Sequence, residues 1–266
     1  MTAIVELKNA TKIVKNGFDE EKIILNDVSL EIFEQDFITI LGGNGAGKST
    51  LFNTIAGTLS LTSGTIRILG EDVTKFSPEK RAKYLSRVFQ DPKMGTASRL
   101  TIEENMAIAQ RRGKSRGLSW GVREKDRELF REALKELNIG LENRLKVDTQ
   151  YLSGGQRQAL TLVMAALVRP KLLLLDEHTA ALDPKTSEMV MELTQKIVES
   201  HDLTTLMITH NMRDALRFGN RLIMMDNGKV IYDVKGEEKA NLTVQDLLER
   251  FEVASENTLS DRMMLG

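Results

Sequence analysis

The chain has 266 residues, of which 41% are hydrophobic, enough for one large core or for a core and a subdomain. Its formal net charge of −1 gives no electrostatic argument for a nucleic-acid partner, and we expect none; the lack of cysteine excludes disulfides, thiolate metal sites and cysteine nucleophiles. The first residues lack a basic region followed by a long apolar segment, and no apolar run reaches the roughly 18 residues of a membrane-spanning helix. We therefore expect a soluble chain without a secretory signal, which would serve a membrane only by docking to a protein that spans it.

Apolar periodicity predicts alternating strands and helices along most of the chain. In chain order, strands are expected at Ile4–Leu7, Ile23–Ile32, Phe37–Leu41, Thr65–Leu69, Ser86–Phe89, Lys171–Leu175 and Thr204–Ile208, and helices at Lys48–Ala56 and Pro184–Glu199. From Thr101 to about Asn138 the chain is polar, charged and helix-forming, and the tail from Thr243 again has helical apolar spacing. The pattern indicates one α/β domain over residues 1–252, with a helical insertion at about residues 93–168 and a tail at 253–266.

A glycine-rich loop follows the third predicted strand and leads into the first predicted helix. Its sequence is Gly42-Gly43-Asn44-Gly45-Ala46-Gly47-Lys48-Ser49-Thr50. Glycines permit positive φ, so successive backbone amides can converge on a phosphate. The ammonium of Lys48 would reach the β- and γ-phosphate oxygens, and the hydroxyl of Ser49 would bind magnesium. This loop predicts a nucleotide site.

Two acidic residues end a buried strand, in Leu172-Leu173-Leu174-Leu175-Asp176-Glu177. Four consecutive apolar residues bury the strand on both faces, so the carboxylates emerge at its carboxyl end, where ligands bind in α/β sheets. We expect Asp176 to hold magnesium, directly or through water, and Glu177 to polarise the attacking water as general base.

A second anion-binding motif lies at Leu152-Ser153-Gly154-Gly155-Gln156, which offers a hydroxyl, bare backbone amides and a helix start. One nucleotide does not need two complete phosphate sites from one small domain. We therefore expect each copy of the chain to present this second site to the nucleotide of a partner copy.

Three single residues complete the candidate set, and each also has an ordinary structural interpretation. Gln90 follows a predicted strand and would reach magnesium and the attacking water, or is simply an exposed glutamine. Asp183 precedes Pro184 and lies near the acidic pair, or only caps the next helix. His210 ends a strand and would bind a γ-phosphate oxygen, or is only a strand-end histidine. Their order behind the two strong motifs favours function.

Along nearly its whole length, to about Phe251, the chain resembles the nucleotide-binding subunit of an ATP-binding cassette (ABC) transporter. The motifs that carry this resemblance are, in order, the Walker A loop at Gly42 to Thr50, the Q-loop glutamine Gln90, the signature Leu152 to Gln156, the Walker B pair Asp176 and Glu177, the D-loop aspartate Asp183 and the switch histidine His210.

The resemblance implies a P-loop fold, in which a RecA-like α/β core carries an antiparallel β subdomain and an inserted α-helical subdomain. It implies ATP and Mg²⁺ as ligands, with Ser49, Gln90 and Asp176 at the metal, and ATP hydrolysis. Two copies would enclose two ATP molecules head to tail, each nucleotide meeting Ser153, Gly154 and Gly155 of the opposite copy. Gln156 and Asp183 are also expected among the nucleotide-binding residues.

Two stretches, Phe89 to Ala97 and Asp176 to Pro184, resemble more narrowly a group of bacterial importers associated with lipoproteins for tryptophan, tyrosine or related ligands. This implies transmembrane permease subunits as partners, an extracellular substrate-binding lipoprotein as an indirect partner, and a place at the cytoplasmic face of the membrane. An export system and a soluble machine, such as iron–sulfur cluster assembly, use the same cassette and remain alternatives.

The chain departs from the family pattern at two positions. Val14 lies where an aromatic residue usually stacks on adenine, and Phe18 is a nearby substitute or a loop aromatic that packs on its own domain. His178 replaces a frequent proline after the acidic pair, and we expect it to pack or hydrogen-bond behind Glu177, the alternative being a pH-responsive neighbour of that glutamate. His201 is expected to be exposed, and the basic stretch Arg111 to Arg116 to be solvated or to face a membrane or permease.

Overall fold

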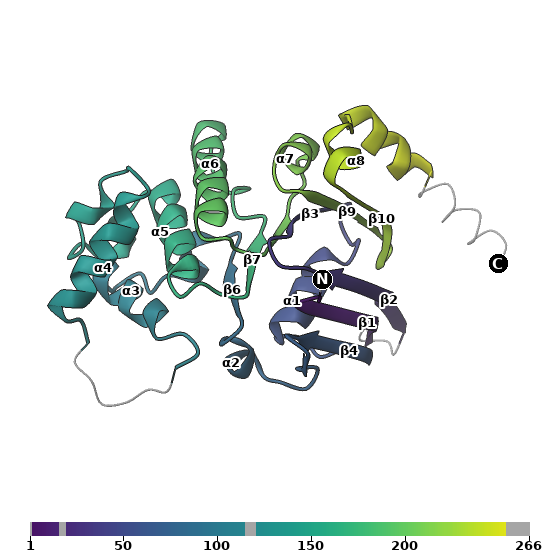
Figure 1. Ribbon diagram of the computed structural model, residues 1–266, viewed down its shortest axis with the longest axis horizontal. Coiled ribbons are helices and arrows are strands. Elements are labelled where there is room, and N and C mark those ends of the chain that lie inside the picture. The colour runs from purple at the N-terminus through teal and green to yellow at the C-terminus, as the bar shows by residue number, and fades with distance from the viewer. Residues whose placement is uncertain (1, 16–19, 115–120, 254–266) are drawn as a thin grey trace. The chain divides into compact units, whose positions relative to one another are not determined.

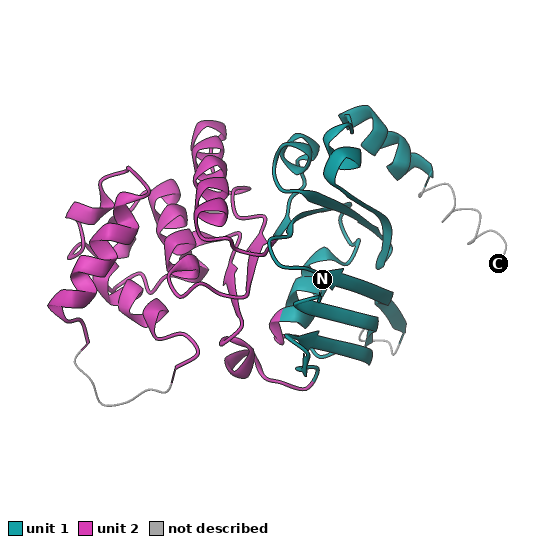
Figure 2. Ribbon diagram, in the orientation of Figure 1, with its two compact units in different colours: residues 1–55, 59–74, 206–266 teal, residues 56–58, 75–205 magenta. Residues whose placement is uncertain are grey.

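The chain forms two compact units in a computed structural model that describes residues 2–15, 20–114 and 121–253. Unit 1 comprises Met1–Ile55, Leu59–Thr74 and Leu206–Gly266, and unit 2 comprises Ala56–Thr58 and Lys75–Thr205 (Figure 2). Within the described residues, no helix combines the length and apolarity needed to cross a membrane.

Unit 1 contains an antiparallel sheet in the strand order β2-β1-β4-β5 (Figure 1). The strands are β1 (Val5–Lys15), β2 (Glu21–Ile32), β4 (Ser63–Ile68) and β5 (Glu71–Asp72). In β2 the side chains of Val28, Leu30 and Ile32 are buried and those between them exposed, which is the alternation of a strand with one face in a core. This confirms the predicted antiparallel β part.

A second set of strands in unit 1 has the order β10-β9-β3-β8, with β9 parallel to β3 and antiparallel to β10. Its elements are β3 (Phe37–Gly42), α1 (Lys48–Ala56), β8 (Thr205–Ile208), α7 (Met212–Arg217), β9 (Arg221–Asp226), β10 (Lys229–Lys235), α8 (Gly236–Ala240) and a helix over residues 244–253. The hairpin β9–β10 turns at Asn227 and Gly228, both with positive φ, as a two-residue type I′ turn requires.

Unit 2 combines the parallel pair β6–β7 with a group of helices. Its elements are α2 (Pro78–Arg81), β6 (Leu85–Val88), η1 (Pro92–Gly95), α3 (Ile102–Gln110), α4 (Glu124–Lys135), η2 (Leu141–Asn143), η3 (Thr149–Tyr151), α5 (Gly154–Ala166), β7 (Leu172–Asp176) and α6 (Pro184–Ser200). Helix α5 is buried along most of its length, and the four leucines of β7 are fully buried. The predicted α/β class with added helices is confirmed.

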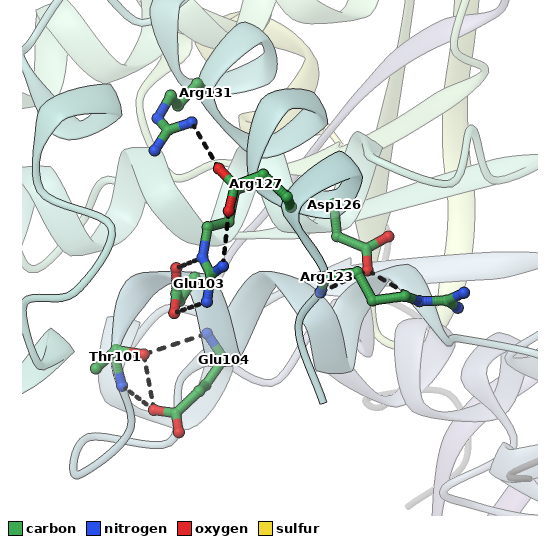
Figure 3. A network of polar contacts seen from close by, with 8 residues as sticks. Thr101, Glu103, Glu104, Arg123, Asp126, Arg127 and Arg131 are labelled. Atoms are coloured by element: carbon green, nitrogen blue, oxygen red, sulfur yellow. Dashed lines mark hydrogen bonds and ion pairs between the residues drawn. The ribbon is translucent and has the colours of Figure 1, made fainter. Parts of the chain in front are cut away.

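Charged side chains tie α3 to α4 within unit 2 (Figure 3). Arg127 donates two hydrogen bonds, of 2.8 and 3.2 Å, to the carboxylate of Glu103 and a third, of 2.9 Å, to Glu124. These bonds raise the pKa of Arg127, with Glu103 the largest cause. A capping box between Thr101 and Glu104 stabilises the N-terminus of α3 (Figure 3). Ion pairs and hydrogen bonds therefore link α3 to α4 in this polar part of the chain.

Candidate functional site

The glycine-rich loop between β3 and α1 is shaped by close backbone approaches within unit 1. A Cβ on Gly42 would lie 2.5 Å from the carbonyl oxygen of Met225, so only glycine fits there. Gly45 and Gly47 have φ of +83° and +99°, which L-residues with a side chain rarely adopt. Nothing lies within 4 Å of a Cβ built on Gly43 or Gly45, so the side of the loop that these residues face is open.

Lys48 and Ser49 begin helix α1 at the end of this loop. The Lys48 ammonium donates to the carbonyl oxygens of Gly42 (2.7 Å) and Gly43 (3.1 Å), which holds its positive charge against the loop. Ser49 is exposed. An ammonium, a glycine-rich backbone and a helix start form a site for a phosphate. The loop therefore fits the terminal phosphates of a nucleotide.

The hairpin turn of β9–β10 supports the loop from behind. The Gly228 amide donates to the Ala46 carbonyl (3.1 Å), and the Gly228 carbonyl accepts from the Asn26 amide (2.9 Å). A Cβ on Gly47 would lie 2.7 Å from the Ile24 carbonyl oxygen. The predicted elements did not include this hairpin, although Asn227-Gly228 is a strong signal for a two-residue hairpin turn.

His210 follows β8, the neighbour of β3 in the sheet of unit 1. The Thr209 amide donates to the Ile40 carbonyl (3.2 Å), two residues before the glycine-rich loop begins. His210 is exposed, and Asn211 behind it caps helix α7. His210 is therefore the first residue beyond Thr209, whose amide makes the hydrogen bond to β3.

In unit 2, Asp176 ends β7 and forms an ion pair with Arg87 of β6, at 2.5 Å between Oδ2 and a guanidinium nitrogen. Both side chains are only 13% exposed, so water screens the pair weakly. Sequence reasoning missed Arg87; its signal was a single basic residue in a strand that runs beside the strand ending in Asp176.

Magnesium at a nucleotide is usually held by one or two protein groups, with phosphate and water oxygens completing the octahedron. The hydroxyl of Ser49 in unit 1 and the carboxylate of Asp176 in unit 2 are each an oxygen donor of the kind that magnesium takes. In the part of the chain that the structure describes, no group of three or more His, Asp or Glu side chains gathers as an all-protein metal site does.

Glu177 has φ of +44°, a left-handed conformation that costs a residue with a side chain roughly 1–2 kcal/mol. The next residue, His178, is 2% exposed, and its Nε2 lies 2.9 Å from Oγ1 of Thr194 in α6. Burial lowers the pKa of His178 to about 4, so the ring is neutral at neutral pH. His178 therefore lies in the core and hydrogen-bonds behind Glu177, as expected.

Gln90 and Glu177 emerge at the same end of the parallel pair β6–β7. Val88 pairs with Leu175, and Gln90 and Glu177 each lie two positions beyond that pair. Gln90 is exposed, and the Phe89 carbonyl before it accepts from Nε2 of Gln158 in α5 (3.2 Å). The structure thus brings Gln90, Asp176 and Glu177 to one edge of unit 2 and ties that edge to α5.

Helix α5 begins with the glycine pair of the predicted second anion site. Ser153 caps it in a reciprocal capping box with Gln156, both bonds being 3.2 Å. Asp183 caps the neighbouring helix α6 by accepting from the Thr186 amide (3.1 Å). Hydrogen bonding from the side chain of Thr186, and then from its amide, lowers the pKa of Asp183. A Cβ on Gly155 would overlap Cγ2 of Thr186, so the starts of α5 and α6 pack directly on each other.

One expectation was wrong, and another holds for only part of its stretch. His201 is half-buried, with its Nε2 lying 3.4 Å from Oε2 of Glu136, because the end of α4 lies against it. Arg112 is half-buried: its guanidinium donates to the Ser86 hydroxyl and to the Ala165 carbonyl (3.2 Å), and burial lowers its pKa, whereas Gly113 and Lys114 of the basic stretch are exposed.

At the expected adenine position, Val14 is 37% exposed in β1 opposite Lys22. Phe18, and Ser115 and Arg116 of the basic stretch, lie outside the described residues.

Comparisons with known proteins agree with this geometry. The sequence model of a family described as "ABC transporter" matches residues 25–180. The chain is 46% identical to the tyrosine transport ATP-binding protein of Clostridioides difficile (strain R20291) over 94% of this chain and 100% of that protein. It is 31% identical to the phosphonates import ATP-binding protein PhnC of Lactococcus lactis subsp. lactis (strain IL1403), over 88% of this chain and 94% of that protein.

The fold also matches solved structures. One is a dimeric ATP-binding cassette in a post-hydrolysis state, bound to ADP and Pi. It superposes with a TM-score of 0.73 and 33% sequence identity, over 87% of this chain and 98% of that one.

Proposed function

Because the chain belongs to the ABC transporter family, we propose that it is the ATP-hydrolysing subunit of a bacterial importer of amino acids or related small solutes. It is an ATPase of this family, and ATP is its nucleotide. The relatives described above are transport or import subunits, which favours import over export or a soluble machine. The 46% identity to a tyrosine transport subunit over nearly the whole chain favours an amino acid as cargo.

We assign the phosphate-binding role to the loop from Gly42 to Thr50, with the Lys48 ammonium against the β- and γ-phosphates. Ser49, Gln90 and Asp176 would hold Mg²⁺, which when bound neutralises charge on the phosphate oxygens. The ion pair with Arg87 holds the Asp176 carboxylate in place at the end of β7.

Glu177 is the proposed general base, since a carboxylate at the end of β7 would accept a proton from the water that attacks the γ-phosphate. His210 and Gln90 would orient that water and the phosphate oxygens. These roles rest on the order of the motifs and on the local geometry of each unit.

The second anion site would act on the nucleotide of another copy. Ser153, Gly154 and Gly155 start a buried, 13-residue helix, so their amides carry the positive end of its dipole. Gln156 and Asp183 would lie at the same contact. The dimeric state of the similar cassette supports this head-to-tail arrangement. ATP would then favour a closed pair of copies, and hydrolysis would release it.

The importer would contain permease subunits, to which this chain docks at the cytoplasmic face of the membrane. An extracellular substrate-binding lipoprotein would deliver the cargo. The proposed single domain over residues 1–252, with a helical insertion at about residues 93–168, would contact the permease through that insertion.

The observation that carries the proposal is that Glu177 follows Asp176 at the carboxyl end of β7, in a chain that also contains a complete phosphate-binding loop earlier in its sequence. Glu177→Gln keeps the shape of the side chain and removes the proton acceptor. ATP binding should persist, turnover should fall at least roughly 100-fold, and closed dimers should accumulate with ATP. Glu128→Gln, an exposed position on α4, is the matched control. Wild-type hydrolysis by the Glu177 variant would remove the base from the proposal.

A further inference from the structure

We propose that His178 is a positioning residue, which holds the backbone of Glu177 in its left-handed conformation through a hydrogen bond to Thr194. The inference rests on the proposed role of Glu177 as general base. It gives a role to two buried residues, His178 and Thr194, which belong to none of the motifs described above.

The direction of the hydrogen bond follows from the partners of Thr194. A hydroxyl has one proton, and that of Thr194 is donated to the Val190 carbonyl, 2.8 Å away in the same helix. Its oxygen can therefore only accept from Nε2 of His178. The ring is consequently the tautomer that carries its proton on Nε2, and the bond is specific in both its geometry and its donor.

Buried contacts fix the chain on both sides of Glu177. Before it, the four buried leucines of β7 lead to Asp176, which pairs with Arg87. After it, His178 bonds Thr194, which is 0% exposed. The carbonyl of Glu177 itself accepts from the Ala180 amide at 3.0 Å. Glu177 is thus a partly exposed residue between two anchors.

The left-handed φ of Glu177 makes these anchors necessary. A glutamate at φ of +44° persists only where its surroundings impose that conformation. Without the His178 bond, the backbone at Glu177 can relax toward the right-handed or extended region. That rotation turns the carboxylate away from its present direction, and a displacement of about 1 Å at a reacting group can cost roughly 100-fold in rate.

The test uses the full-length chain and pairs each disruptive variant with a conservative one. His178→Leu and Thr194→Val remove one partner each, while His178→Gln keeps an N–H donor and Thr194→Ser keeps the hydroxyl. For His178→Leu and Thr194→Val we expect a kcat for ATP hydrolysis that is roughly 10- to 100-fold below wild type, with a KM for ATP within about twofold of the wild-type value. The conservative variants His178→Gln and Thr194→Ser should have a kcat within about threefold of wild type.

Two further measurements separate positioning from general stability. Thr205→Val is the matched control, because Thr205 is equally buried and also loses one hydroxyl bond, to the Leu203 carbonyl. It should keep wild-type kcat. In the Glu177→Gln background, adding His178→Leu should lower the residual rate no further, and ATP-dependent dimerisation should be unchanged.

The outcomes distinguish this inference from the proposed function. If Glu177→Gln hydrolyses ATP normally, the base assignment fails and the inference fails with it. If that variant is inactive but His178→Leu and Thr194→Val turn over as wild type, only the inference is overturned. It is overturned equally if Thr205→Val loses as much activity, or if the His178→Leu loss persists in full without Glu177.

Discussion

Gly155→Ala tests the packing of α5 against α6 at the second anion site. A Cβ at this position would lie far closer to Cγ2 of Thr186 than the ordinary contact distance between two carbon atoms, so one helix start must move. Such overpacking costs roughly 1–3 kcal/mol. The helix propensity of alanine returns about 1 kcal/mol of this. The free energy of unfolding should therefore fall by up to about 2 kcal/mol, which lowers Tm by up to roughly 8 °C for a chain of this size.

Gly154→Ala is the matched control for that change. Its Cβ would lie 3.4 Å from Cδ2 of Leu182, an ordinary contact, so alanine at the first helical position should leave Tm unchanged or raise it. Thr186→Ser deletes the methyl group that Gly155→Ala would meet and should restore most of the loss in the double variant. Thermal and urea unfolding give the stability of the wild type, of the two alanine variants and of the double variant. Equal stability of the two alanine variants, or no rescue by Thr186→Ser, would refute the packing argument.

Further predictions concern the anion sites and the buried histidine. Gly154→Asp should leave ATP binding to the monomer intact and block ATP-dependent dimerisation in size-exclusion chromatography, because a carboxylate would repel the partner's phosphates; dimers that survive would contradict the trans-acting site. Gly42→Ala should abolish ATP binding or unfold the loop, since its Cβ meets the Met225 carbonyl, whereas Gly43→Ala meets nothing within 4 Å and should fold normally in circular dichroism. His178 has a pKa of about 4 in the fold and about 6.5 when unfolded, so its contribution to stability is complete above pH 6.5 and is lost as pH falls toward 4, by roughly 3 kcal/mol. Urea unfolding of His178→Gln should show a smaller loss between pH 7 and pH 4.5, and an unchanged loss would contradict the burial argument.

Local sequence signals were enough for the elements that carry phosphate chemistry. Helix α1 was predicted with its observed bounds, since the glycine-rich loop marks its start and Gly57 its end. Strand β7 was predicted one residue early, because four leucines define its buried part but not its last residue. The strands β9 and β10 were missed despite their Asn227-Gly228 turn, as their apolar run lies beyond the motifs that guided the prediction.

Features that depend on tertiary contacts were beyond the sequence. The partner of His178 lies 16 residues away on the next helix, and nothing in the spacing specifies Thr194. The left-handed φ of Glu177 has no sequence signal, because glutamate does not favour it. His201 was expected to be exposed from its polar neighbours, and the end of a helix more than 60 residues earlier covers it.

Helix α6 connects two groups that the proposed mechanism uses in different nucleotide sites. Its first turn carries Thr186, which packs on Gly155, and about two turns later it carries Thr194, which holds His178 behind Glu177. Helix α6 therefore positions both the amides at the start of α5, which would contact the partner's nucleotide, and the Glu177 carboxylate, which would act on the subunit's own nucleotide. A tilt of α6 displaces both together. Within the proposed pair of copies, the two sites are therefore expected to become competent at the same moment rather than one after the other.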